Sequence, residues 1–272
     1  MILKHAFADS QGDTAFEVTD TISTAGHRFI ETGRQVRLTH LSENYQGPNV
    51  QTENHFYRQV RALLRHDRPT NDPQRPWLED DAAVLAANLG HTLELDLCGA
   101  KVTDVALAAV AKAQRLSILD LRFTPITDDG LAHLASLEHL QALYLGGAAR
   151  HAGRKITNAG LEHLVGLTRL RRLSLNNTKI GNDGVKIIGQ MALLEQLDLS
   201  NTGINDQALG QVGALRELKH LELANTYITD AGVAQLAQLK HLEYLNLFDT
   251  SVTDEAVMAL QAFLPDTWIR QE

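Results

Sequence analysis

Residues that could do acid–base or metal chemistry are scattered through the first 70 positions of the chain. Histidines without a partner at ligand spacing, as in HExxH, are usually ordinary surface or core residues. We therefore expect no catalytic or metal site from them, although an enzyme or ligand-binding module in residues 1–70 remains an alternative. The five histidines of this region are His5, His27, His40, His55 and His66.

One cysteine and two carboxylates could act together further along the chain. Cys98 is the single cysteine, so it cannot form an intrachain disulfide, and no histidine is aligned beside it to activate the thiol. Asp96 and Asp120 would lie on adjacent strands, where paired carboxylates can do acid–base work. The regular surface that carries them offers no cleft. We expect a protein that is not an enzyme and that uses no cofactor and no metal.

The basic segment GGAARHAGRK, residues 146–155, combines glycines with cationic side chains. Such a combination can hold a phosphate, but the segment lacks the GxxxxGK[ST] pattern of nucleotide-binding loops. It instead predicts an anchor for an acidic partner, steered by attraction between opposite charges. The basic residues of the segment and just after it are Arg150, His151, Arg154, Lys155, Arg169, Arg171 and Arg172.

Composition limits the function classes. A net charge of −8 makes a phosphate backbone a poor partner, so we expect no nucleic acid. The first residues contain no sustained apolar run, which predicts no signal peptide, and no stretch approaches about 18 consecutive apolar residues, which predicts no membrane span. With one cysteine and no disulfide, we expect a cytoplasmic protein.

An internal repeat supplies the elements that must position these residues. Two leucine columns, which begin at Leu95 and Leu97, keep step with a column of isoleucine or valine, and seven aligned copies predict a repeat architecture. One copy carries six extra residues, and these fall in segment 146–155; a tolerated surface insertion is the alternative to a functional one. The isoleucine and valine column, with spacings of 24, 30, 24, 24, 24 and 24, is Val102, Ile126, Ile156, Ile180, Ile204, Ile228 and Val252.

Each copy predicts a strand followed by a helix. The L-x-L pair alternates as in a short strand that points both leucines into one core, and GLxxLxxL has helical spacing. Asp and Asn are preferred helix N-caps, and a column of them just ahead of the helical pattern predicts seven helix starts. That column is Asp104, Asp128, Asn158, Asn182, Asp206, Asp230 and Asp254.

The copies, written LxxLxLxxTxITDxGLxxLxx, resemble the leucine-rich repeat family and its 24-residue ITDxGL subtype, found in bacterial and F-box-associated proteins. The resemblance covers residues 78–270. It implies an α/β, right-handed solenoid with parallel strands on the concave face and helices on the convex face. Where the family has Asn or Cys, this chain has a threonine in five copies, and Ala100 and Ala148 in the other two.

The ends predict two domains. Residues 1–70 form an N-terminal module, interpreted as a cap over the solenoid's exposed core, and residues 71–272 form the solenoid. The solenoid comprises a partial repeat at 78–92, seven repeats at about 92–263 and a terminal strand at about 267–270. Asp80, which lies 24 residues before Asp104, would start the first helix, and Trp268 would cover the last repeat.

The side chains that point away from the core would form the binding surface, because concave solenoid faces are extended binding sites. We predict a non-enzymatic scaffold that binds a protein partner on this face and on the inserted loop. By resemblance, a substrate-recognition subunit or a bacterial effector of the F-box type is the alternative. The predicted partner-binding residues are Arg122, Tyr144, Arg150, His151, Arg154, Lys155, Arg172, Asn176, Asp198, Glu222, Tyr244 and Phe248.

Overall fold

A computed structural model describes residues 78–147 and 155–271 in full, and it describes the backbone of five strands within residues 1–77. The chain divides into two compact units, Met1–Thr70 and Asn71–Glu272. In the first unit, β1 (His5–Ala8), β2 (Thr14–Glu17) and β5 (Gln35–Arg37) form an antiparallel sheet. A second antiparallel pair joins β3 (Ile22–Thr24) and β4 (His27–Phe29).

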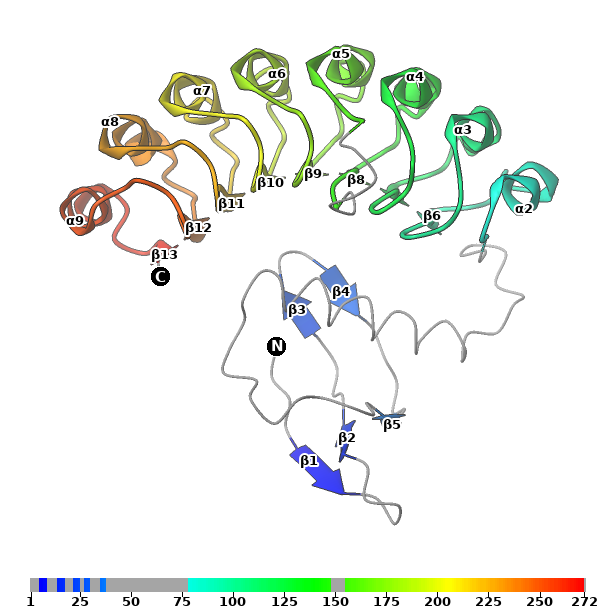
Figure 1. Cartoon of the computed structure of the whole chain (residues 1–272), viewed down its shortest axis with the longest axis horizontal. Coiled ribbons are helices and arrows are strands. Elements are labelled where there is room, and N and C mark those ends of the chain that lie inside the picture. The colour runs from blue at the N-terminus through cyan, green and yellow to red at the C-terminus, as the bar shows by residue number, and fades with distance from the viewer. Residues whose placement is uncertain are drawn as a thin grey trace. The chain divides into compact units, whose positions relative to one another are not determined.

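The second unit is a single sheet of eight parallel strands in sequence order, with a helix after nearly every strand. The strands line the inner side of a curved arc and the helices form its outer side (Figure 1), which confirms the predicted α/β solenoid. The strands are β6 (Glu94–Asp96), β7 (Ile118–Asp120), β8 (Ala142–Tyr144), β9 (Arg172–Ser174), β10 (Gln196–Asp198), β11 (His220–Glu222), β12 (Tyr244–Asn246) and β13 (Trp268–Arg270).

The helices are short, and three of them continue into a 3-10 turn. No helix in the described part of the chain is both long enough and apolar enough to cross a membrane. They are α2 (Asp81–Ala86), α3 (Asp104–Val110), α4 (Asp128–Leu131), α5 (Asn158–Leu161), α6 (Asn182–Ile188), α7 (Asp206–Val212), α8 (Asp230–Val233) and α9 (Asp254–Phe263).

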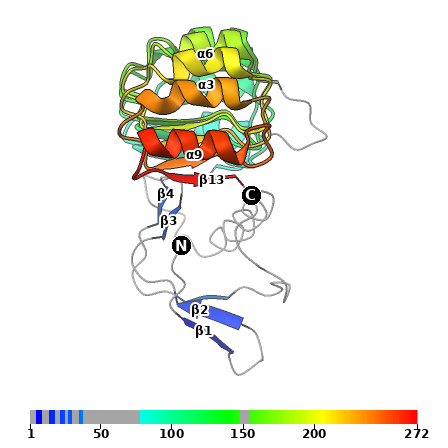
Figure 2. The same ribbon diagram turned by 90° about the vertical axis from the view of Figure 1, so that its left-hand side faces the viewer.

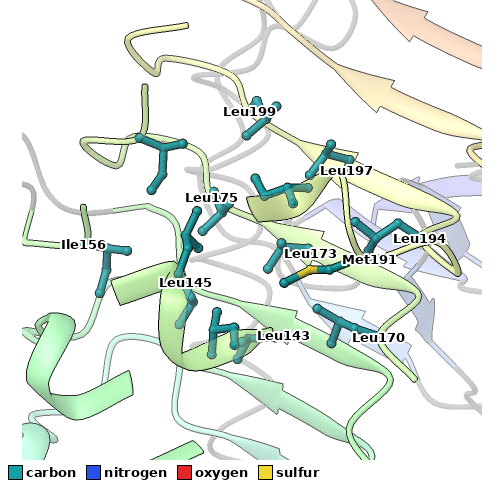
Figure 3. Packing of buried hydrophobic residues seen from close by; sticks show 14 of the residues in the cluster. Leu143, Leu145, Ile156, Leu170, Leu173, Leu175, Met191, Leu194, Leu197 and Leu199 are labelled. Atoms are coloured by element: carbon teal, nitrogen blue, oxygen red, sulfur yellow. The ribbon is translucent and has the colours of Figure 1, made fainter. Parts of the chain in front are cut away.

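Leucine columns fill the space between the sheet and the helices. The central residue of each strand from β6 to β12 is the first leucine of an L-x-L pair, and β13 has Ile269 there. Adjacent strands align these residues directly, as with Leu173 and Leu197. Leu175 and Leu199, from the next column, are fully buried. Figure 3 shows how side chains from successive repeats pack against one another without interruption. The core is therefore one continuous aliphatic layer that no repeat completes alone.

A fixed turn follows each strand. At Asn177, Asn201 and Asn225 the backbone takes the left-handed conformation, with φ between 52° and 59°. The next residue is the repeat's threonine, whose hydroxyl donates to the carbonyl three residues earlier, as from Thr202 to Leu199 at 2.5 Å. Ala100 makes only the backbone bond to Leu97.

The column of Asp and Asn before each helix does not cap that helix, contrary to the sequence prediction. The N-cap is the preceding residue, such as Thr127 before α4, and Asp128 is the first helical residue. The Asp128 side chain turns instead to the next repeat. There its Oδ1 accepts from the Thr157 amide at 2.8 Å and its Oδ2 accepts from the Thr157 hydroxyl at 2.5 Å.

This contact, which we call the inter-repeat clamp, recurs along the solenoid. Each clamp joins the first residue of one helix to the N-cap of the following helix. Because the amide it satisfies lies at a helix start, where no intrahelical partner exists, the clamp does for the next repeat what a cap would do. The clamp pairs are Asp81–Thr103, Asp104–Thr127, Asp128–Thr157, Asn158–Gly181, Asn182–Asn205, Asp206–Thr229 and Asp230–Thr253.

The choice between Asp and Asn follows from the partner. A carboxylate accepts at both oxygens, so Asp stands opposite threonine, which donates an amide and a hydroxyl. Gly181 has no hydroxyl, and its partner is Asn158. The side-chain oxygen Oδ1 of Asn205 accepts from the side-chain amide Nδ2 of Asn182 at 2.8 Å. Each Asp–Thr junction and the Asn182–Asn205 junction therefore has two hydrogen bonds, and the junction to Gly181 has one.

The first clamp corrects the predicted register of the partial repeat. Asp80 is the N-cap of α2 and accepts from the Ala83 amide at 2.9 Å. Asp81, and not Asp80, makes the clamp to Thr103. The partial repeat is therefore spaced 23 residues from the next one at this position, because Asp81 corresponds to Asp104.

The clamp also explains the small residue two positions after the Asp or Asn. A Cβ added to Gly130 would lie 2.2 Å from Oδ1 of Asp104, the clamp residue of the preceding repeat. Gly232 stands in the same relation to Asp206. The position stays small because the neighbouring repeat's side chain passes over it.

We expect Asp128→Ala to lower the free energy of unfolding by about 1–3 kcal/mol, because it leaves the amide and hydroxyl of Thr157 without their acceptor. Asp128→Asn, which keeps an acceptor for the amide, should cost less. Urea denaturation measures both. Asp129→Ala is the matched control, since Asp129 is the exposed next residue, and an equal loss in this control would contradict the clamp.

Candidate functional site

The concave face of the sheet carries three columns of side chains around the buried leucines. The first column starts at Glu94, the second at Asp96 and the third at Cys98, and strand pairing keeps the first two in register from β6 to β13. These columns change chemistry along the arc, whereas the leucine columns do not. Ionic groups stand at the β6 end, amides and hydroxyls in the middle, and aromatic rings at the β13 end.

An ion pair dominates the β6 end. The Arg122 guanidinium donates to Asp120 through Nε at 3.0 and 3.1 Å and through Nη2 at 2.6 Å. The same guanidinium lies 5.2 Å from the ring centre of Tyr144, a favourable distance for a cation–π contact. Side-chain exposure is only 13% for Arg122 and 5% for Asp120. Arg122 and Tyr144 are both predicted partner-binding residues. In the structure Arg122 contacts Tyr144 and Asp120 of its own chain.

The electrostatics keep Arg122 charged. Burial alone would lower the pKa of Arg122, but the negative charge of Asp120 and the hydrogen bonds to it raise that pKa above its usual value. Cys98 and Asp96 act in the same direction. The pair is therefore a fixed internal element of the face.

Three potential metal ligands meet at this end. The ligand atoms of Asp96, Cys98 and Asp120 lie within 4.8 Å of one another. However, both oxygens of Asp120 already accept from Arg122, and Oδ1 of Asp96 accepts from the Cys98 amide at 3.1 Å. A cation here would have to compete with a guanidinium that already neutralises the carboxylate.

A polar network occupies the middle of the face. Oδ2 of Asp198 accepts from Asn176 at 2.6 Å and from Ser174 at 3.1 Å, and its Oδ1 accepts from the Ser200 amide at 3.0 Å. The next strands repeat the pattern, with Asn246 donating to Glu222 at 2.7 Å. The structure therefore brings the predicted residues Asn176 and Asp198 together.

A second ion network joins the residues that come just before strands β9, β10 and β11. Glu195 accepts from Lys219 at 2.9 Å and also from Arg171. The hydrogen bond from Lys219 and, to a smaller degree, that from Arg171 hold the pKa of Glu195 below its usual value, although desolvation opposes them. Arg171 thus pairs with an acid of the same chain, and the expected cluster of positive charge is partly neutralised.

Aromatic rings line the β13 end. Tyr244 lies between His220 and Trp268, with ring-centre distances of 6.2 and 5.1 Å. Burial lowers the pKa of His220 below its usual value of 6.5. Trp268, which the sequence suggested as a cover for the last repeat, contacts Tyr244 of that repeat and remains 64% exposed. In the next column the Arg270 guanidinium lies 5.1 Å from the ring centre of Phe248.

Only the two ends of the inserted segment lie within the described residues. Arg150, His151 and Arg154 lie outside the described residues. Lys155 is exposed, and its Nζ donates to the Pro125 carbonyl at 3.4 Å. Arg172, on β9, is half-buried on the concave side.

Sequence reasoning missed one feature of this face. It placed Asp120 and Arg122 on one face of a strand without pairing them, although residues two apart in a strand share a face. The sequence does group Tyr244 and Trp268 at the C-terminal end, and their spacing of 24 residues, one full repeat, places them on adjacent strands.

Comparison with known proteins places the chain in a family. The family model for a leucine-rich repeat region matches residues 124–263, about half of the chain. The chain belongs to the leucine-rich repeat family. Members of this family generally act as scaffolds for protein–protein contacts. No curated protein matches the chain.

Two solved structures of bacterial proteins are similar to this chain. Internalin C2 of Listeria monocytogenes is 22% identical, with a TM-score of 0.58 over 72% of this chain and 76% of the internalin chain. A leucine-rich repeat protein of Leptospira interrogans is 19% identical, with a TM-score of 0.43, and the match covers 66% of this chain and 54% of that one. The likeness to internalin C2 concerns the fold alone.

We expect Arg122→Met to lower the free energy of unfolding by about 3–5 kcal/mol, because it leaves the Asp120 carboxylate buried without its partner. The double variant Arg122→Met/Asp120→Asn should lose less than Arg122→Met alone. Chemical denaturation gives both values, with the exposed Arg115→Met as control. Losses that simply add would show that the two side chains do not depend on each other.

Proposed function

We propose that the protein is a non-enzymatic scaffold that binds a protein partner across its concave face. The observation that carries this proposal is the change of chemistry along three aligned columns while the leucine frame stays constant. A frame needed only for stability would not require an ion pair at one end and a row of aromatic rings in contact at the other.

The partner would contact the face in two zones. Near β9, Asn176 lies beside the start of the inserted segment, since its carbonyl accepts from the Gly147 amide. Arg172, at the other end of the same strand, and Arg150, Arg154 and Lys155 of the segment would add positive charge for an acidic region of the partner. Near β12, Tyr244 and Phe248 would provide aromatic anchors, which commonly supply most of the binding energy. Asp198 and Glu222, held by their amide neighbours, would fix the orientation of the partner between these zones.

The setting of this activity is also part of the proposal. The ITDxGL pattern and the single cysteine, Cys98, favour a cytoplasmic member of the bacterial or F-box-like repeat subtype. Residues 1–70 would serve as the cap of the solenoid. Acid–base or metal chemistry has little support on the concave face, because Asp120 is already paired with Arg122.

We expect a photo-crosslinking amino acid at Asn176 or Tyr244 to capture a specific protein in cells that express the full chain. The same amino acid at Glu162 or Gln235, exposed on the helix side, is the matched control and should capture none. Mass spectrometry of the products identifies the captured protein. Capture from the helix-side positions alone would contradict the assignment of the concave face.

A further inference from the structure

The last strand of the sheet, β13, has an unusual chemistry for an edge. It pairs with β12 on one side and has no second neighbour within the described sheet. Figure 2 shows β13 and α9 as the final turn of the stack. Open edges of this kind favour pairing with another strand. Trp268, Phe263 and Met258, all in or next to this last turn, are 64%, 60% and 73% exposed.

The backbone of β13 presents one donor and one acceptor to the open side. The Trp268 amide donates to Glu243 at 2.9 Å, and the Arg270 carbonyl accepts from Leu247 at 2.7 Å, so both residues bond toward β12. Because backbone groups alternate sides along a strand, the N–H and C=O of Ile269 face away from β12. This single residue can exchange both bonds with itself in an antiparallel copy.

We propose that two copies of this chain associate through β13, with Ile269 opposite Ile269 across a two-fold axis. This dimer does not depend on the proposed binding of a partner. The residue just before this centre in one copy then lies opposite the residue just after it in the other copy. Trp268 of one copy therefore faces Arg270 of the second copy, twice.

The side chains fit this register. Opposite residues in an antiparallel pair point to the same face of the sheet, and the flanking pair is the non-hydrogen-bonded type, in which side chains lie closest. Trp268 and Arg270 both lie on the concave side, where an indole face and a guanidinium form a favourable cation–π pair. Ile269 is in register with Leu245, so the Ile269 side chains of the two copies would pack against each other in the core layer.

The symmetry also explains why this edge would close and not polymerise. A contact of a surface with itself is satisfied by two copies, so association stops at a dimer. The dimer would extend the parallel sheet into a single sheet with an antiparallel junction, and it would cover the exposed apolar side chains of the last turn.

Sedimentation velocity of the full chain from about 1 to about 100 µM tests this, because dimer populations depend on concentration. The wild type should approach twice its 30.0 kDa mass. Ile269→Pro removes the outward N–H and no bond to β12, although it also replaces a side chain that packs against the core. This variant should be a folded monomer, while Ile269→Val keeps the N–H and should remain dimeric. A monomeric wild type, or an Ile269→Pro variant that dimerises as tightly as Ile269→Val, would overturn the proposal.

A charge swap tests the register. Trp268→Arg places like charges opposite each other twice and should weaken dimerisation about tenfold or more. The double variant Trp268→Arg/Arg270→Glu should restore it, since each arginine then faces a glutamate. Circular dichroism and an unchanged denaturation midpoint show that each variant is folded. Folded Trp268→Arg that still dimerises like wild type, or a double variant that fails to recover, would rule out this pairing.

Discussion

Each repeat of this solenoid depends on a hydrogen bond that it receives from the previous repeat. The helices from α2 to α8 have only four to seven residues and therefore few internal hydrogen bonds, and such short helices are marginal alone. The inter-repeat clamp gives the first free amide of each helix an acceptor from the preceding repeat, as Asp206 does for Thr229 at 2.8 Å. Together with the shared leucine core, the clamp makes the stability of each repeat depend on the repeat before it.

This constraint separates the positions that must stay from those that can change. The leucines, the clamp residue and its small neighbour are each required by a contact with an adjacent repeat, and the turn threonine is required by a hydrogen bond within its own repeat. The concave columns touch only their neighbours on the same face, so they can carry any chemistry that remains hydrogen-bonded. Arg122 with Asp120, Asn176 with Asp198, and Tyr244 with Trp268 are three local solutions on one frame.

The sequence was sufficient for the architecture because the same contact recurs every 24 residues and leaves a visible column. It was insufficient for the clamp, since Asp128 is equally plausible as a cap of its own helix when only one chain segment is considered. The correct role needs the position of Thr157, which lies 29 residues away across the insertion. The ion pair of Arg122 was missed for the opposite reason. Its partner, Asp120, is only two residues away in the same repeat, so the pair does not recur at the 24-residue spacing.

Hydrogen exchange under native conditions on the Asp128→Ala variant tests the central claim most directly. If neighbouring repeats hold one another through the clamp, amides around α4 and α5 should lose protection first, while those around α7 and α8 should stay close to wild type. Solenoids, whose contacts are mainly between nearest neighbours, permit such local loosening. A uniform loss of protection from α2 to α9, or no change around the junction between Asp128 and Thr157, would contradict the account.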